Sequence, residues 1–372
     1  MLSIKKLKEG IKSMGMKRKS SIFTLSMSTM LMLALAGCAD DSSTEDNGAS
    51  EDTNTESTET ADTEASSSEY PIVIEHALGE ATIEEKPERI AAIAWSNHDV
   101  PLALGVMPVG LSAANYGVQD DSGILPWTAE AIEEIGGEEP VLFQDTDGID
   151  FEAVADVDPD VILATYSGLT QEEYDTLSQI APVVAYQDAP WVSSWREQVT
   201  YNSMAMGMAE EGEQLIADTE QLIADKVAEY PEFEGTTAAF LSVNAADLSS
   251  FFVYSPEDPR GAFLGEIGME YPDSLLNEFT DPGAFYIEAS AENADMLNDA
   301  DVLVSYGDEN TLEAMQNDPI LGQVPAIERG SVVIIGDNTP LAASGTPSTL
   351  SIEYTIDEYL SLMSEAVSKL EQ

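Results

Sequence analysis

The sequence predicts an α/β protein made of two similar lobes joined by a single long helix. Short apolar runs, typical of buried strands, alternate with segments of helical periodicity in both halves of the chain. Between the halves, residues 191–230 carry a sustained helical pattern. Because parallel strands connected by helices form Rossmann-like sheets, we expect one such lobe in residues 70–190 and a second in residues 231–372.

Residues 1–37 are interpreted as a lipoprotein signal peptide. A basic Lys-Arg-Lys stretch precedes an uncharged run, residues 20–36, that is too short and too rich in Ser and Thr to span a bilayer. The run leads into Leu-Ala-Gly-Cys, which resembles the lipobox at which a bacterial lipoprotein is cleaved and diacylated on its cysteine thiol. Cys38, the only cysteine of the chain, is therefore the expected lipidation site.

Residues 38–69 are expected to tether the folded part to that lipid. After Cys38 they contain eleven acidic residues, no basic ones and almost nothing that could enter a core. This composition predicts a disordered chain. Its flexible span is about 30 Å, which follows from roughly 5–6 Å times the square root of its length.

The part of the chain after the tether is strongly acidic. Residues 70–372 contain seven Lys and Arg residues against 58 Asp and Glu residues, a net charge of −51. Such a surface repels nucleic acid, so no nucleic-acid partner is expected. The charge either forms a well-solvated face without a partner or indicates a salt-rich or alkaline habitat, where salt screens the repulsion.

The first lobe is predicted from short apolar strands and two helices. The strands are expected at residues 89–94, 108–111, 161–164 and 183–185, and the helices at residues 99–104 and 170–180. This order favours a parallel sheet.

The second lobe repeats the pattern of the first. Its strands are expected at residues 237–243, 250–254, 302–305 and 332–335, and a closing helix at residues 351–370. Ile149-Asp150-Phe151-Glu152 leads a short helix into one strand of the first lobe, and Ser290-Ala291-Glu292-Asn293 leads another into a strand of the second. A cleft between two such lobes is a natural place for a small ligand.

Several motifs together resemble the ferric-siderophore substrate-binding lipoproteins of ABC importers. They are Lys86-Pro87-Glu88-Arg89-Ile90 followed by Trp95, Leu102 to Gly110, Asp158-Pro159-Asp160-Val161-Ile162 and Leu177 to Val184. The similarity covers residues 71–370, and the order and spacing of the motifs carry it. It implies two α/β lobes bridged by a rigid helix, a monomer anchored by lipid to the outer face of the cytoplasmic membrane of a Gram-positive cell, and delivery of a ferric siderophore to an ABC permease dimer with its ATPase.

The resemblance also implies a ligand site without catalytic residues, protein-held metal or cofactor. It assigns the ligand contacts to Trp95, Tyr116, Tyr166 and Ser167 of the first lobe and to Tyr254, Arg260, Phe285 and Tyr286 of the second. Aromatic walls with an Arg donor suit a ferric siderophore, which presents a mostly apolar shell with a few chelating oxygens.

One departure from the family concerns the charge of the ligand. Ferric-hydroxamate binders of this family carry an Arg in the loop before the helix that begins near Phe151, where this chain reads Gln144-Asp145-Thr146-Asp147-Gly148. A trianionic ferric catecholate would need several cations, and residues 70–372 supply only seven basic residues. A neutral or cationic ferric complex is therefore favoured.

Two glutamates are expected at the permease. In the family, a Glu at the top of each lobe meets Arg residues of one permease subunit, and the matching positions here are Glu152 and Glu292. Each carboxylate opens a short helix, where the helix dipole alone would also favour it.

Two other functions are weighed against siderophore capture. A cobalamin or haem binding protein of the same importer class would share the fold. A surface-anchored hydrolase would need a nucleophile motif, and the sequence contains no Gly-x-Ser-x-Gly or His-Glu-x-x-His. The two histidines, His76 and His98, are too few for direct capture of zinc or manganese.

Overall fold

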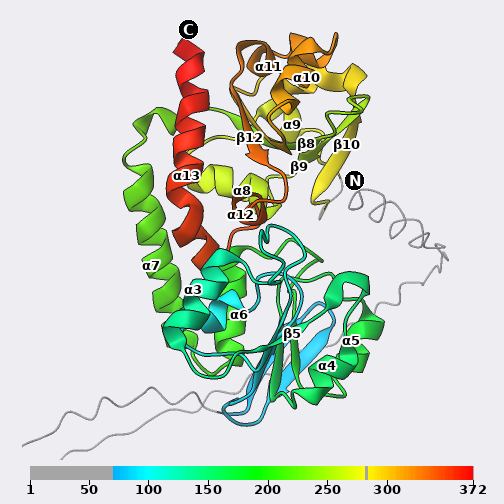
Figure 1. The fold of residues 1–372 in the computed structure, drawn as a ribbon, viewed down its shortest axis with the longest axis vertical. Helices are drawn as coiled ribbons and strands as arrows, with labels where there is room; N and C mark the ends of the chain where they lie inside the picture. The colour runs from blue at the N-terminus through cyan, green and yellow to red at the C-terminus, as the bar shows by residue number, and fades with distance from the viewer. Residues whose placement is uncertain (1–69, 281–283, 372) are drawn as a thin grey trace, which may run out of the picture. The chain divides into compact units, whose positions relative to one another are not determined.

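The computed structural model describes residues 70–280 and 284–371, which all lie in one structural unit (Figure 1). The signal peptide, Cys38 and the acidic tether lie outside the described residues, so what the sequence indicates about them stays a prediction. Within the described part of the chain, no helix is long and apolar enough to cross a bilayer.

The first lobe is built on a five-stranded sheet whose neighbouring strands are all parallel. Its strand order is β5-β4-β3-β6-β7, and the antiparallel hairpin β1–β2 packs beside β7. The strands are β1 (Ile72–His76), β2 (Gly79–Ile83), β3 (Ile90–Ala92), β4 (Gly110–Ser112), β5 (Val141–Phe143), β6 (Val161–Ala164) and β7 (Val183–Ala185). The helices are α2 (Asp99–Ala103), α3 (Pro126–Ile135), α4 (Phe151–Asp156) and α5 (Gln171–Leu177), with a 3₁₀ turn η1 (Asp145–Asp147).

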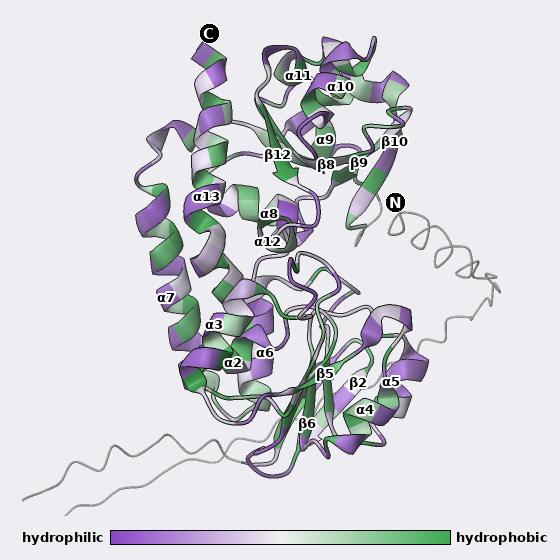
Figure 2. Ribbon diagram, viewed as in Figure 1, coloured by the Kyte–Doolittle hydropathy of each residue, from purple (hydrophilic) through white to green (hydrophobic). Residues whose placement is uncertain are grey.

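The strands of this sheet are buried on both faces. Ala91 and Ile162 belong to one hydrophobic core, whereas their chain neighbours Ile90 and Val161 belong to another. Burial on both faces explains why β3 and β6 are continuous apolar runs rather than alternating ones. Figure 2 shows the strands in the hydrophobic colour and the outer helices with mixed faces.

The second lobe is built on a mixed sheet of order β10-β9-β8-β11-β12. Its strands are β8 (Ala238–Val243), β9 (Ser250–Tyr254), β10 (Tyr286–Ser290), β11 (Val302–Gly307) and β12 (Val332–Gly336). Its helices are α8 (Pro259–Glu266), α9 (Asp273–Leu276), α10 (Thr311–Asn317), α11 (Pro325–Arg329), α12 (Pro340–Ala343) and α13 (Thr349–Val367). Four 3₁₀ segments complete this half, η2 (Pro231–Phe233), η3 (Ala291–Leu297), η4 (Leu321–Gln323) and η5 (Ser368–Glu371).

The expectation of parallel strands is wrong at one end of this second sheet. β8, β11 and β12 are parallel, but β9 is antiparallel to both β8 and β10. The reason is the connection between β8 and β9, which consists only of residues 244–249. A parallel crossover takes a dozen or more residues, so a short loop returns the chain antiparallel.

The helical segment between the lobes is two helices, α6 (Trp195–Ala205) and α7 (Ala209–Val227). They pack against each other around a turn at Gly207, whose φ of +66° is readily adopted only by glycine. The expected long helix is α7, which at 19 residues is about 28 Å long. The lobe boundaries expected at residues 190/191 and 230/231 stay predictions.

A second helix joins the lobes beside α7. α13 contacts α7 along its length and packs on α2 and α3 of the first lobe and on β11 and β12 of the second (Figure 1). The two lobes are therefore joined by α13 as well as by α7.

Candidate ligand-binding site

The first-lobe site residues follow the carboxyl ends of three adjacent strands. Trp95 follows β3, Tyr116 follows β4, and Tyr166 with Ser167 follows β6. Since the carboxyl ends of parallel strands meet at one edge of a sheet, the loops that carry these residues lie together. Ser167 is fully buried, and its hydroxyl has no partner among the described residues, so its side chain lies beneath the surface of the site.

The second-lobe residues come from β9, β10 and the start of α8. Tyr254 ends β9 and pairs with Tyr286 at the start of β10. Phe285 contacts the Tyr286 ring with 4.6 Å between centroids. Arg260 occupies the first turn of α8. Tyr254 is thus the residue that links the edge of the sheet to Arg260.

Arg260 is held by three neighbours of the second lobe. Its Nη1 donates to both carboxylate oxygens of Asp258 at 3.0 and 2.9 Å, and its Nε donates to the Tyr306 hydroxyl at 3.1 Å. The guanidinium carbon lies 4.4 Å from the centroid of the Tyr254 ring. Asp258 also caps α8 through the Arg260 backbone N–H. These contacts fix the guanidinium plane before any ligand arrives.

One nitrogen of Arg260 stays available. Nη2 has no hydrogen-bond partner among residues 70–280 and 284–371, and the side chain is 19% exposed. Burial raises the pKa of Tyr166, and the positive charge of Arg260 opposes that rise. Burial likewise raises the pKa of Tyr254. Both phenols are therefore neutral donors beside a fixed cation at physiological pH.

The two lobes touch at the rim of this site. The Tyr116 hydroxyl donates to Asp337 at 2.6 Å, and the Gly117 N–H donates to the Asn338 side chain at 2.8 Å. Tyr116 and Trp95 also pack on a small core that includes Ala343 of α12. Tyr116 therefore serves as a contact between the lobes as well as a candidate ligand contact.

Backbone strain gathers around these residues. Six described non-glycine residues have a φ in the left-handed region, and four of them, Ala94, Ser96, Trp191 and Asn338, lie beside Trp95, Tyr166 or Tyr116. Residues other than glycine adopt such backbone at a cost of roughly 1–3 kcal/mol, and such strain clusters at functional sites. Both chain neighbours of Trp95, Ala94 and Ser96, adopt this strained backbone.

Two residues of the site were missed by the sequence analysis. Tyr306 lies near the carboxyl end of β11, so a search for aromatic residues at strand ends would have found it. Trp191 lies 5.3 Å from the Tyr166 ring, edge to face, and is 36% exposed. Its sequence neighbours place it only at the start of the bridging segment, so no local signal ties it to Tyr166.

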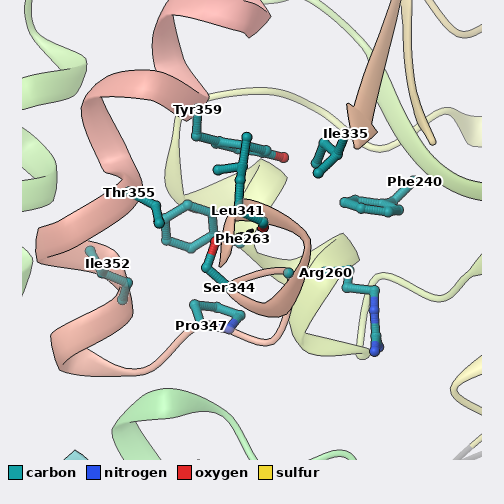
Figure 3. A pocket seen from close by; sticks show the side chains of 11 residues that line it. Phe240, Arg260, Phe263, Ile335, Leu341, Ser344, Pro347, Ile352, Thr355 and Tyr359 are labelled. Carbon is teal, nitrogen blue, oxygen red and sulfur yellow. Dashed lines mark hydrogen bonds between the residues drawn. The ribbon is translucent and has the colours of Figure 1, made fainter. Parts of the chain in front are cut away.

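An apolar cavity adjoins Arg260 on the second-lobe side. Figure 3 shows side chains of α12 and α13, including Leu341 and Tyr359, turned toward it, with Phe263 beside them and Arg260 at its border. Phe240 closes another side and contacts the rings of both Tyr254 and Tyr306. The cation of the site is thus set in apolar surroundings, where a hydrogen bond from it to a ligand is stronger than in water.

The candidate docking glutamates occupy equivalent places in the two lobes. Glu152 is exposed in the first turn of α4, which precedes β6, and Glu292 is exposed in the first turn of η3, which precedes β11. β6 and β11 each lie between a central strand and the edge strand of their sheet. The two similar sequence segments that carry Glu152 and Glu292 therefore occupy equivalent positions in the two lobes.

The environment of His98 does not support a serine hydrolase. Its Nε2 lies 3.4 Å from Asp99 and from the Thr128 hydroxyl, and the Ser348 hydroxyl donates to Asp99 rather than to the imidazole. A serine nucleophile needs the imidazole as its base, so this cluster has the wrong order of contacts.

A comparison with protein families decides what this two-lobed fold is. The family model described as periplasmic binding protein matches residues 90–339. This range includes both five-stranded sheets and all the candidate ligand contacts. The chain belongs to the periplasmic binding protein family.

Relatives of this periplasmic binding protein include named iron carriers. The probable siderophore-binding lipoprotein YfiY of Bacillus subtilis is 26% identical over 245 residues, 64% of this chain and 69% of YfiY. The ferric enterobactin-binding periplasmic protein FepB of Escherichia coli is 25% identical over 284 residues, 73% of this chain and 86% of FepB. The resemblance drawn from the sequence motifs is confirmed.

A solved structure gives a more detailed comparison. PiaA of Streptococcus pneumoniae in complex with ferrichrome is 51% identical, with a TM-score of 0.77, over 80% of this chain and 99% of PiaA. The α/β fold with two lobes expected for this periplasmic binding protein is thereby confirmed.

Proposed function

We propose that this protein captures a ferric siderophore between its lobes and delivers it to an ABC permease for iron uptake. The observation that carries the proposal is Arg260, a preoriented cation with a free Nη2 between neutral tyrosines from both lobes. A ferric siderophore presents chelating oxygens within an apolar shell. Arg260 can donate to the oxygens, and the tyrosine rings can pack against the shell. The similarity to PiaA, whose structure contains ferrichrome, supports the same assignment.

The proposed ligand is a neutral or cationic ferric complex, and the ferrichrome bound to PiaA makes a hydroxamate the first candidate to test. Arg260 is paired with buried Asp258, so the pair adds no net charge to the site. The other arginines are engaged elsewhere: Arg89 and Arg329 with backbone carbonyls, Arg196 with Glu220 and Glu266. Asp337 adds a negative charge at the rim through Tyr116. A triply negative complex would meet net repulsion.

The test is a tryptophan-fluorescence titration of the purified protein with ligands that differ in charge. A neutral ferric trihydroxamate, a trianionic ferric tricatecholate, haem and cobalamin are compared at the same ionic strength. We expect saturable quenching at submicromolar to micromolar concentration with the trihydroxamate and much weaker binding of the tricatecholate. Tight binding of haem or cobalamin without any ferric siderophore would contradict the proposal and favour another carrier of this importer class.

We further propose that the lipid on Cys38 holds the protein at the outer face of the cytoplasmic membrane and that Glu152 and Glu292 dock on the permease. The two carboxylates lie at equivalent, exposed places of two lobes, as a permease with two subunits requires. Docking and capture would then use different surfaces of the protein.

Charge reversal separates docking from capture. The pair Glu152→Lys and Glu292→Lys should abolish siderophore-dependent iron uptake in cells while the purified protein binds its ligand normally. The matched control is Glu172→Lys with Glu313→Lys, two exposed glutamates in the first turns of α5 and α10, which should leave uptake unchanged. Normal uptake by the first pair, or loss of ligand binding, would contradict the docking role.

A further inference from the structure

A second cavity lies behind Trp95, between the first lobe and the segment that carries Thr346 and Ser348. Half-buried residues, Trp95, Ala113 and Ala114, line one part of it, and buried residues line the rest. The polar buried residues are Ser96, His98, Asp99, Ser112, Thr346 and Ser348. Nothing in the proposed contacts of the chelate with Arg260 uses this space.

The groups around this cavity accept hydrogen bonds. Asp99, whose side chain is 1% exposed, accepts from Trp127 Nε1 at 3.1 Å and from the Ser348 hydroxyl. His98 is 7% exposed, and its Nδ1 has no partner among the described residues. Because Nε2 faces the Asp99 carboxylate, the proton belongs on Nε2, which leaves Nδ1 with a free lone pair. Burial lowers the pKa of His98, in keeping with a neutral ring.

The charges around the cavity are negative. No Lys or Arg lines it, whereas Asp99 does, and Ser112 donates to the Asp145 carboxylate. The other oxygen of Asp145 is buried without a partner among the described residues. A hydrogen-bond donor suits His98 Nδ1, and a cation would meet the Asp99 carboxylate and no positive side chain among the described lining residues.

The cavity borders the proposed ligand cleft. Trp95 is shared by the two, and Thr346, another lining residue, lies near the Tyr166 hydroxyl. The Trp95 ring offers a face to a cation that passes it. An arm of a ligand held at Arg260 and Tyr166 thus has a short way into the cavity.

We propose that this cavity is a subsite for a primary ammonium group at the end of a pendant arm of the ferric siderophore. The ammonium would donate to His98 Nδ1 and be attracted by the nearby Asp99 carboxylate, with Trp95 at the entrance. The inference rests on the proposed function and narrows it to siderophores that carry an amine. Burial raises the pKa of Asp99, and the donors Trp127, Thr128 and Ser348 oppose that rise.

The experiment uses three linear ferric trihydroxamates that differ only at the end of one arm: ammonium, hydroxyl or methyl. A charge-assisted hydrogen bond to a buried group is worth about ten- to a hundredfold in affinity. We expect the ammonium form to bind the wild-type protein at least about tenfold more tightly than the hydroxyl form, which has nearly the same size.

Two variants locate the preference. Asp99→Asn and His98→Phe should each reduce the ratio of ammonium to hydroxyl affinity. If Asp99→Asn does not fold, the ratio of ammonium to hydroxyl affinity in the wild type and in His98→Phe still tests the subsite. Equal affinity of the three forms for the wild type, or a ratio that neither folded variant changes, would overturn the subsite and leave siderophore capture intact. Failure of all three forms to bind would instead count against the proposed function.

Discussion

Replacement of Arg260 separates its contribution to binding from its contribution to stability. In Arg260→Lys the positive charge stays beside Asp258, but an ammonium cannot serve Asp258, Tyr306 and a ligand in one plane as the guanidinium does. The expected loss is the bond from Nη2 to a chelating oxygen. A hydrogen bond from a charged donor contributes about 1.5–3 kcal/mol, which corresponds to a roughly ten- to more than hundredfold weaker affinity.

Arg260→Ala adds a cost to the fold. The side chain of Asp258 is 1% exposed, and its side-chain partner in the structure is Arg260. Removing one member of a buried ion pair typically destabilises a protein by about 3–5 kcal/mol because a buried charge is left alone. The alanine variant should therefore show both a weaker affinity and a lower melting temperature.

Calorimetric titration and thermal unfolding measure the two effects. Arg329→Lys is the control, because Arg329 bonds to Asp301 and Ser331 at the amino ends of β11 and β12, the end of the sheet opposite Tyr306. It should leave the affinity unchanged. The reasoning is refuted if Arg260→Lys folds like the wild type and binds the ferric ligand with unaltered affinity.

Three further predictions concern the backbone, the net charge and the anchor. Gly105→Ala should cost about 1–2 kcal/mol, since its φ is +72° with open space around it, whereas Gly207→Ala should cost more because a Cβ there would also overlap the Tyr70 hydroxyl; equal losses in urea denaturation would contradict this. The melting temperature should rise as added salt shortens the Debye length from about 30 Å at 0.01 M to about 3 Å at 1 M, because the acidic surface repels itself, and a flat salt response would argue against that repulsion. Cys38→Ala should leave a soluble or uncleaved product on fractionation, because no acyl chain can be attached; a correctly cleaved variant that stays on membranes would contradict lipidation.

The strands that the sequence predicts well are those whose apolar pattern matches their burial. β6 and β9 match their apolar runs because every residue, or every second one, must enter a core. β5 was not predicted, since it is a three-residue edge strand whose first residue, Val141, is 48% exposed. β10 pairs with β9 alone and carries an exposed Glu288, so its pattern resembles that of a loop.

Contacts between the lobes could not be predicted from the sequence. The hydrogen bond from Tyr116 to Asp337 joins residues 221 positions apart, and no local pattern marks either partner. The pairing of Asp258 with Arg260 is different, because Asp-Pro-Arg brings both groups to the first turn of one helix. The sequence thus indicates which residues can bind a ligand, whereas their grouping depends on tertiary packing.

The central claim is that the cleft at Arg260 captures a ferric siderophore, and isothermal titration with a ferric trihydroxamate and its iron-free form tests it most directly. The iron complex folds the chelator into a compact shell that presents its oxygens together, whereas the free chelator must lose conformational entropy to do so. We predict saturable binding of one ferric complex per protein and at least about tenfold weaker binding of the free chelator. Absence of binding to the ferric complex, with a folded protein and an intact melting transition, would contradict the account.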